Sequence, residues 1–392
     1  MSEDRRAAVC APPLQLPAAA MADQMGQTLS LARIDREPEG RARCASWIVS
    51  PAFDLLFLVN AGWVLAFLPG FLSAERTPHI EFWQIYFLTT PHRWITLLLV
   101  ATDPDRRLGR GKLFAAMAVM ALVVVSAVRW ASGGFVCLLL IDYVWNAWHF
   151  AAQHAGILRM YSRKCGGGHP RLETWCLRAT VFYTSLRLAG WSTGWTEAYP
   201  TARSGLTILD VVMSLPVVLL FAVELIARPW RRPGKMAYLT SVSTMYLSLL
   251  ASVALGWTTL ILSLTAAAAA FHAIEYLAVV SHYAQRRRTH GAPSLFSKMA
   301  RAWGSMLALY VILFGMLAQM ADVWSHEIWL GVNLWAAGLH YAYDGMIWKL
   351  RAAPTAQTLG VELPARESAA PPSRKLATAG TPELVSATAE MS

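Results

Sequence analysis

Residues 257–283 read WTTLILSLTAAAAAFHAIEYLAVVSHY. An α-helix rises about 1.5 Å per residue, so this apolar stretch is long enough to cross a bilayer hydrocarbon core of about 30 Å. The same stretch contains His272, Glu275 and His282. Ionisable side chains near the centre of a bilayer cost at least about 2.5–3.5 kcal/mol each and usually mark a functional site. The stretch therefore predicts both a membrane fold and the location of its chemistry.

The composition of the whole chain agrees with a membrane protein. Of its 392 residues, 56% are hydrophobic and 15% are charged, whereas soluble chains are about 45–50% apolar and about 25% charged. The five cysteines form no CxxC pair. These values exclude a disordered chain, a disulfide-stabilised secreted domain and a simple cytosolic protein. A polytopic, all-α transmembrane helix bundle is the expected fold class.

Apolar segments suited to crossing a membrane recur along the chain. We expect ten of them, at Phe53–Leu72, Ile80–Ala101, Leu113–Val128, Phe135–Leu158, Trp175–Trp191, Leu206–Ala227, Ala237–Leu255, Trp257–Tyr283, Ala302–Met320 and Glu327–Trp348. The fifth is the least apolar because it contains Arg178 and Arg187, and it could instead lie in the interface or line a polar cavity.

The distribution of basic residues supports this set of spans. Lys and Arg gather before the first segment, after the last, and in every second connection between them. The remaining connections contain only Arg76, Arg129 and Arg203. By the positive-inside rule this pattern predicts about ten spans with both termini in the cytoplasm, although eight spans would also satisfy it. The net charge of +10 is thereby explained by topology, so we expect no nucleic-acid partner. The expected location is the cell inner membrane.

The two ends of the chain differ in composition from the rest. Residues 1–46 are rich in Ala, Pro and Arg, and residues 352–392 are rich in Ala, Pro, Thr, Ser and Glu. Both compositions are typical of disorder. We therefore expect a disordered N-terminal segment (1–46), a transmembrane helical domain (47–351) and a disordered C-terminal tail (352–392).

Histidines are concentrated on alternate segments. His92, His149, His272 and His340 lie on the second, fourth, eighth and tenth segments. All four of these segments would run toward the cytoplasm, and each histidine would lie about 12–17 Å inside the cytoplasmic boundary. Four separate helices thus bring an imidazole to a similar depth, so we expect them to converge on one site.

Further polar residues occupy the same helix faces. On the fourth segment, Asp142, Asn146, His149 and Gln153 follow one stripe of a helix. A second layer nearer the cytoplasm contains His154, Asp344 and His282.

Imidazoles and carboxylates from facing helices suit Fe, Mn or Zn, and helix bundles commonly house di-iron carboxylate sites. We expect non-haem iron, in a dinuclear centre. The expected metal ligands are His92, His149, His154, His272, Glu275 and His340. Glu275, Asp344 and His154 are the expected catalytic groups, acting as further ligands or as carboxylates and imidazoles that orient the ligands.

Three blocks of this pattern resemble membrane-bound non-haem iron enzymes, which include the lipid desaturases and hydroxylases and the Brp/Blh-type carotene dioxygenases. The blocks are WNAWH at 145–149 with QHAG at 153–156, residues 272–283, and HYAYDG at 340–345. No HxxxH, HxxH or HxxHH box of the desaturases occurs among these histidines. The resemblance therefore implies the broader class, a histidine-ligated iron oxygenase.

The sequence thus predicts an O2-using, metal-dependent oxidoreductase that acts on a lipid-soluble small molecule in the membrane. If a reductase supplies electrons, we expect a separate electron-donor protein on the basic cytoplasmic face. Two alternatives remain open: an electron carrier with a haem between two histidines, and a proton-coupled transporter using Arg93, Asp142, Glu275 and Asp344.

Overall fold

We analysed a computed structural model of the protein, which describes residues 46–68, 84–107, 109–227, 229–289 and 293–361. The chain divides into two units, Met1–Arg43 and Cys44–Ser392, and every described residue belongs to the second. All regular elements within the described ranges are helices, which confirms the all-α class. The expected disorder of 1–46 falls almost wholly outside the described residues.

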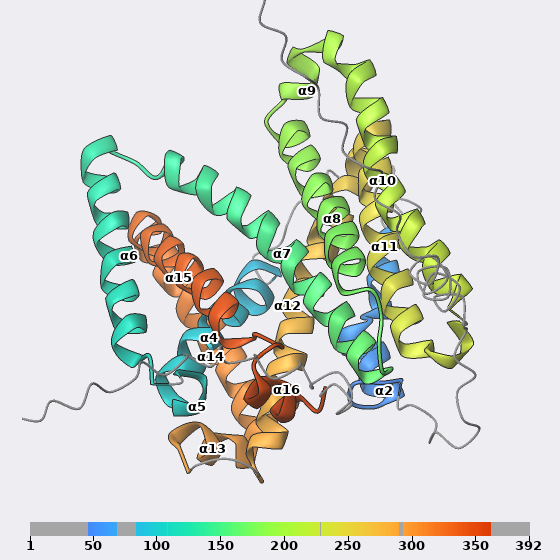
Figure 1. Cartoon of the computed structure of the whole chain (residues 1–392). Helices are drawn as coiled ribbons and strands as arrows, with labels where there is room; N and C mark the ends of the chain where they lie inside the picture. The colour runs from blue at the N-terminus through green and yellow to red at the C-terminus, as the bar shows by residue number, and fades with distance from the viewer. Residues whose placement is uncertain (1–45, 69–83, 108, 228, 290–292, 362–392) are drawn as a thin grey trace, which may run out of the picture. The chain divides into compact units, whose positions relative to one another are not determined.

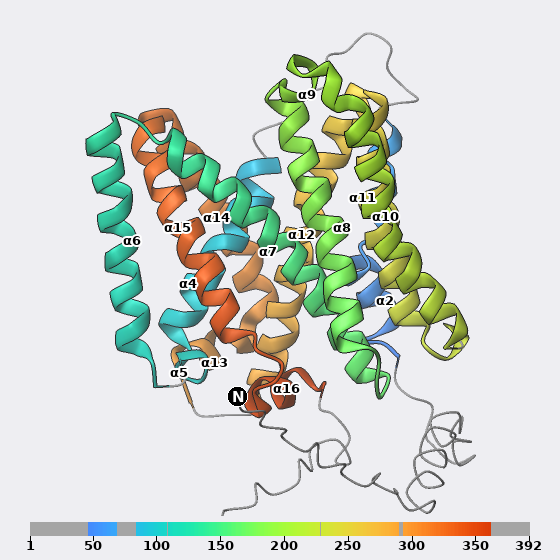
Figure 2. The same ribbon diagram turned by 45° about the horizontal axis from the view of Figure 1, so that its top comes forward.

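Eight long helices correspond to the third to tenth predicted segments (Figures 1 and 2). They are α6 (Gly111–Ser132), α7 (Val136–Lys164), α8 (Pro170–Ser192), α10 (Arg203–Ile226), α11 (Pro233–Leu255), α12 (Thr258–Arg287), α14 (Trp303–Trp324) and α15 (His326–Ile347). Pro170 and Pro233 begin α8 and α11, where a missing backbone N–H costs nothing. Gly133 and Gly256 end α6 and α11 in the left-handed region, which glycine adopts without strain.

Five helical stretches are long and apolar enough to cross a membrane: Gly111–Ser132, Arg203–Ile226, Pro233–Leu255, Thr258–Arg287 and Leu295–Trp324. The last joins α13 (Leu295–Met299), the 3₁₀ turn η6 (Ala300–Ala302) and α14. On α6 only Phe114 is buried, as expected of a helix whose surface faces lipid. Helices α7, α8 and α15 are not among these apolar stretches. Each of the three carries ionisable residues noted above.

The first predicted segment, Phe53–Leu72, is not one continuous helix. Within residues 51–67 the chain forms α2 (Pro51–Phe53), the π-helical turn η1 (Asp54–Leu58) and the 3₁₀ helix η2 (Ala61–Phe67). Asn60 separates the last two with a φ of 47°, a conformation that Asn tolerates better than most residues. Asp54 holds the start in place, since its carboxylate accepts hydrogen bonds from the backbone N–H of Ile48 and from Tyr161. Residues 69–72 lie outside the described ranges.

The second predicted segment begins with the π-helical turn η3 (Gln84–Thr89) and continues as α4 (Thr90–Thr102). Pro91 lies in the first turn of α4; because proline has no N–H to donate to the preceding turn, it marks the change from one helix type to the other. Residues 80–83 lie outside the described ranges. A short helix, α5 (Pro104–Arg107), follows α4.

The predicted C-terminal tail is ordered in its first part. Ala353–Leu359 form α16, which contacts α12. Thr355, Leu359 and Val361 are buried, and His282 Nε2 lies 3.1 Å from the Leu359 carbonyl oxygen. Composition suggested a disordered tail from residue 352, but two apolar side chains and a capping glycine, Gly360, are enough to fold these few residues onto α12. Residues 362–392 lie outside the described ranges.

Helix α12 lies at the centre of the packing. It contacts α4, α7, α11, α14 and α16 as well as η2 and η3, and it has buried residues from Ile261 to Arg287. Helix α7 lies between α15 and α8 in both views (Figures 1 and 2) and contacts both of them. The connections at the helix ends include α9 (Trp195–Ala198) and the 3₁₀ turns η4 (Pro200–Ala202) and η5 (Pro229–Arg231).

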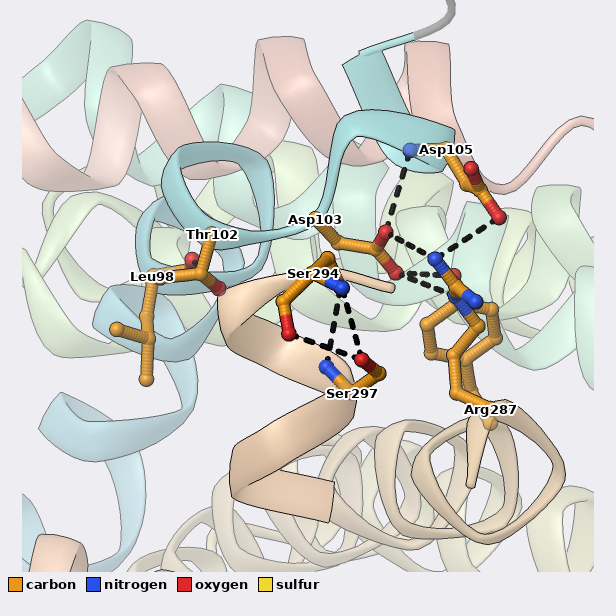
Figure 3. Close-up of polar contacts among 8 residues, drawn as sticks. Leu98, Thr102, Asp103, Asp105, Arg287, Ser294 and Ser297 are labelled. Carbon is orange, nitrogen blue, oxygen red and sulfur yellow. Dashed lines mark hydrogen bonds and ion pairs between the residues drawn. The ribbon is translucent and has the colours of Figure 1, made fainter. Parts of the chain in front are cut away.

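An ion pair joins the end of α4 to the end of α12 (Figure 3). Arg287 donates to both carboxylate oxygens of Asp103, at 2.9 and 3.0 Å, and Tyr283 donates to Asp103 at 2.5 Å. Arg287 also pairs with Asp105 at 3.0 Å. Beside it, Ser294 and Ser297 form a reciprocal capping box that begins α13. Burial raises the pKa of Asp103, but the hydrogen bonds from Arg287 and Tyr283 lower the pKa more, so it lies below its ordinary value.

Replacing Asp103 tests this ion pair. We expect Asp103→Asn to lower the free energy of unfolding by about 3–5 kcal/mol, because it removes one partner of a buried charge pair. Asp105→Asn is the matched control: its side chain is 40% exposed, so its loss should cost no more than about 1 kcal/mol. Thermal unfolding of the detergent-solubilised protein measures both.

The lowered pKa of Asp103 also determines how the stability of the protein depends on pH. A carboxyl whose folded pKa is depressed contributes stability above its unfolded pKa of about 3.9, and the contribution disappears as the pH falls through the folded pKa. We therefore expect the wild-type chain to lose more stability than Asp103→Asn between about pH 5 and the acid limit. Equal acid sensitivity of the two proteins would contradict this assignment.

Candidate metal centre

Four helices each place one histidine in a common buried cluster, which we call the histidine quartet. Its members are His92 on α4, His149 on α7, His272 on α12 and His340 on α15. They are 3%, 6%, 0% and 0% exposed. The convergence expected from their common depth is therefore present in the fold.

The four rings form a closed circuit. The ring centroids of His92 and His272 are 5.0 Å apart, and those of His272 and His149 are also 5.0 Å apart. His149 and His340 are 4.6 Å apart, and His340 and His92 are 5.1 Å apart. Neighbouring planes meet at 72–89°, so the rings meet edge to face rather than stacking.

Three nitrogens of the quartet are close enough to hold an ion. One ligating nitrogen from each of His92, His272 and His340 lies within 4.8 Å of the other two. His149 is not part of that group of three, but its Nε2 is 3.0 Å from His340 Nε2. Imidazole nitrogens bind zinc at about 2.0–2.1 Å, so the spacing of the three nitrogens suits one metal ion.

Several of these nitrogens have no other partner among the described residues. His92 Nδ1 and both ring nitrogens of His272 are buried without a hydrogen bond. Phe150 stacks on the His272 ring with centroids 3.9 Å apart, which fixes the ring without satisfying its nitrogens. Buried polar groups are usually hydrogen bonded, so packing alone does not account for His92 and His272, whereas a metal ligand role would.

Hydrogen bonds on the Nδ1 side of the ring set the orientation of His340. Thr96 Oγ1 lies 2.7 Å from His340 Nδ1 and 2.6 Å from the hydroxyl of Tyr276, and Trp348 Nε1 donates to the same hydroxyl. This series of hydrogen bonds leaves Nε2 of His340 facing the quartet. Partners of this kind typically fix the tautomer and ring position of a metal ligand.

Two carboxylates approach the quartet from the α15 and α7 side. Asp344 Oδ2 is 4.0 Å from His149 Nε2, and Asp344 Oδ1 has no hydrogen bond among the described residues. Asp142 accepts a hydrogen bond from Tyr341 at 3.1 Å, and the Tyr341 ring lies 5.0 Å from that of His149. Asp344 is thus the nearer carboxylate to the quartet nitrogens.

His154 and Glu275 form a separate pair beside the quartet. His154 Nδ1 is 3.0 Å from Glu275 Oε2 and 3.1 Å from the hydroxyl of Tyr238, while its Nε2 is 3.1 Å from the hydroxyl of Tyr246. Gln153 donates to Glu275 at 3.1 Å. Every polar atom of His154 therefore has a partner, and its ring centroid is 6.4 Å from that of His272.

His282, which was expected in the second polar layer, lies elsewhere and contacts α16. Two tyrosines of α12 and α15 also point to other partners: Tyr283 donates to Asp103, and Tyr343 donates to the Phe114 carbonyl. The sequence reasoning missed Thr96, Tyr238, Tyr246 and Phe150. Thr96 follows His92 by one helical turn on the same face, and Tyr238 and Tyr246 share a face of α11; those spacings were the available signal.

Comparison of the chain with protein-family models, with curated proteins and with solved structures found no match.

The pair beside the quartet yields a stability prediction. We expect His154→Leu to lower the free energy of unfolding by roughly 2–5 kcal/mol, since it removes the imidazole that joins buried Glu275, Tyr238 and Tyr246. His169→Leu, at an exposed position, should change it by less than about 0.5 kcal/mol. Denaturation followed by tryptophan fluorescence checks the difference; comparable unfolding of the two variants would argue against the network.

Proposed function

We propose that this chain is a multi-pass membrane protein with about ten spans and both termini in the cytoplasm, located in the cell inner membrane. The five apolar helices support a membrane location. The shorter apolar stretch Pro51–Phe67 and the less apolar helices α4, α7, α8 and α15 would complete the set. The polar residues of these helices would turn toward the quartet and its surroundings rather than toward lipid. The alternation of basic connections along the sequence supports the orientation.

We propose that the histidine quartet binds one metal ion. The observation that carries this proposal is the convergence of buried imidazoles from four helices. One nitrogen each of His92, His272 and His340 lies within 4.8 Å of the others, and Nδ1 of His92 and both nitrogens of His272 have no hydrogen bond among the described residues. Imidazole suits Fe, Zn, Cu and Ni. We favour iron because a carboxylate, Asp344, lies beside the histidines, and none of the cysteines in the described ranges does. This is a hard, oxygen-tolerant set of groups.

A single ion accounts for the arrangement better than the dinuclear centre expected from sequence. A second ion would need Glu275 and His154, whose donor atoms already bond to Gln153, Tyr238 and Tyr246. We therefore propose His92, His149, His272 and His340 as the ligands. Glu275 and His154 would support His272, the ligand on α12, through Gln153. Gln153 donates both to Glu275 and, at 2.8 Å, to the His272 carbonyl.

The ring geometry argues against haem. A macrocycle held between two histidines needs a flat gap between their planes. Here His149 and His340 have centroids 4.6 Å apart at 72° to one another, and the other two imidazoles close the sides of the same space. A non-haem site is the better interpretation.

We propose that the protein is an oxidoreductase acting on a lipid-soluble molecule. Iron held by histidines supplies one-electron redox chemistry and reaction with O2. The protein would contribute an apolar surround that excludes water, and Asp344 as the group placed to accept or return a proton beside His149. Electrons would come from a separate donor protein, for which the basic cytoplasmic connections offer a docking face.

Metal analysis of the purified protein tests the proposal. We expect about one iron per chain in the wild type, and loss of most of it in His272→Ala and His149→Ala. His326→Ala is the matched control, because its side chain is 75% exposed. Less than one metal per chain, unaffected by His149→Ala, would reject the metal site and leave the transporter as the remaining candidate. A Soret band in the absorption spectrum would favour haem instead.

Thr96 offers a finer test of the same site. Thr96→Val keeps the shape of the side chain but removes the hydroxyl that holds His340 Nδ1, so we expect metal affinity to fall about 10- to 100-fold with the fold intact. Thr102→Val is the control on the same helix, since its hydroxyl bonds only to the Leu98 carbonyl. Metal competition with a chelator gives the ratio; equal affinities would show that Thr96 does not orient a ligand.

A further inference from the structure

Two of the three arginines of α8, Arg178 and Arg187, have very different surroundings. Arg187 Nε lies 3.2 Å from Asp210 Oδ1 on α10, and Tyr183 donates to the same carboxylate. Arg178 has no hydrogen bond or ion pair within the described part of the chain, and its Nε is buried without a partner. An arginine on a membrane helix normally pairs with an acid or a carbonyl, so Arg178 is a cation that lacks its counter-charge.

Tryptophans hold Arg178 in place. Its guanidinium carbon lies 5.1 Å from the ring centroid of Trp148 on α7 and 5.9 Å from that of Trp175. Cation–π contacts of this kind position the planar group and leave its edge free for an anion. Trp175 is 59% exposed and Trp148 38%, so the place is accessible from the surface of the helix pair.

An apolar groove begins at Trp148. It has a volume of about 490 Å³ and is lined by Leu140, Ile141, Val144, Trp145, Trp148 and Phe182. Helices α7 and α8, which form it, lie side by side (Figure 2). The groove is shallow and open to the surface of the helix pair. Any lipid chain could occupy such a groove, so it is Arg178, in contact with the Trp148 wall, that specifies the occupant.

The groove is also connected to the histidine quartet. The ring of Trp145 lies 5.7 Å from that of Tyr341, and the ring of Tyr341 lies 5.0 Å from that of His149. Trp145 is thus both a wall of the groove and one aromatic side chain removed from a quartet member.

We propose that the α7–α8 groove binds a long-chain carboxylic acid, with its carboxylate on Arg178 and its tail against Trp148 and Trp145. The guanidinium fork matches a carboxylate through two parallel hydrogen bonds. A carboxylate also neutralises the cation with a headgroup small enough to lie among tryptophans within the helix pair. The inference rests on the proposed function in one respect only: it assigns this acid as the lipid-soluble substrate.

The test is direct binding to the full chain in nanodiscs of zwitterionic lipid. The probe is a long-chain fatty acid carrying a photoreactive diazirine near the end of its tail, competed by the unlabelled acid or by the alcohol of the same length. We expect cross-links on peptides of α7 or α8, and the acid to compete about 10- to 100-fold better than the alcohol, as for a charge-assisted pair. Arg178→Gln should abolish that preference, and Arg178→Lys should restore part of it.

A second pair of variants tests the groove independently of charge. Val144→Trp fills the groove and should prevent labelling. Val124→Trp adds the same bulk at a comparably exposed position on α6, 47% against 41% exposed, and should leave labelling unchanged. Elution on size-exclusion chromatography confirms that each variant is folded.

Three results would overturn the proposal: equal competition by acid and alcohol, labelling that survives both Arg178→Gln and Val144→Trp, or displacement of the acid by an anionic phospholipid at lower concentration. The last would make Arg178 a phospholipid site. Metal content is measured on the same samples. Metal loss only in the histidine variants, with acid binding lost only in the groove variants, separates failure of one proposal from failure of the other.

Discussion

The arrangement of this protein depends on the cost of placing imidazoles in an apolar helix bundle. A buried ring nitrogen without a partner is unfavourable, yet four helices that are far apart in sequence, α4, α7, α12 and α15, each place one imidazole in the same buried cluster. The rings of His92, His149, His272 and His340 meet edge to face there. Nδ1 of His92 and both nitrogens of His272 have no hydrogen bond among the described residues. The surrounding network, from Thr96 and Tyr276 on one side to His154 and Glu275 on the other, then fixes the rings.

The hydropathy pattern was sufficient to predict the long helices because each apolar segment has the length of a membrane span. It was insufficient at residues 51–67, where Asn60 turns the chain, since one residue in the left-handed region leaves no mark on the hydropathy average. It was insufficient again at α16, whose few buried residues lie within a polar, proline-containing stretch. Composition averages over a segment, whereas both features depend on single side chains finding specific partners in the fold.

The quartet could be anticipated because depth along a helix follows from residue count and facing follows from helical periodicity. What could not be anticipated was which histidines have other partners. His154 and His149 are five residues apart on one helix, yet His154 meets Tyr238 and Tyr246 of α11 while His149 meets α15. Which helix lies opposite each ring is a property of tertiary packing, and a single sequence does not encode it in any local pattern.

Helix α16 has a consequence for how the molecule is made. Its contacts include His282 with the Leu359 carbonyl and Arg106 with Thr355, so the same few residues touch both the end of α12 and the short α5. Residues 353–361 follow every other described helix in the chain. During synthesis, this corner therefore stays uncovered until α16 has left the ribosome and can pack against it.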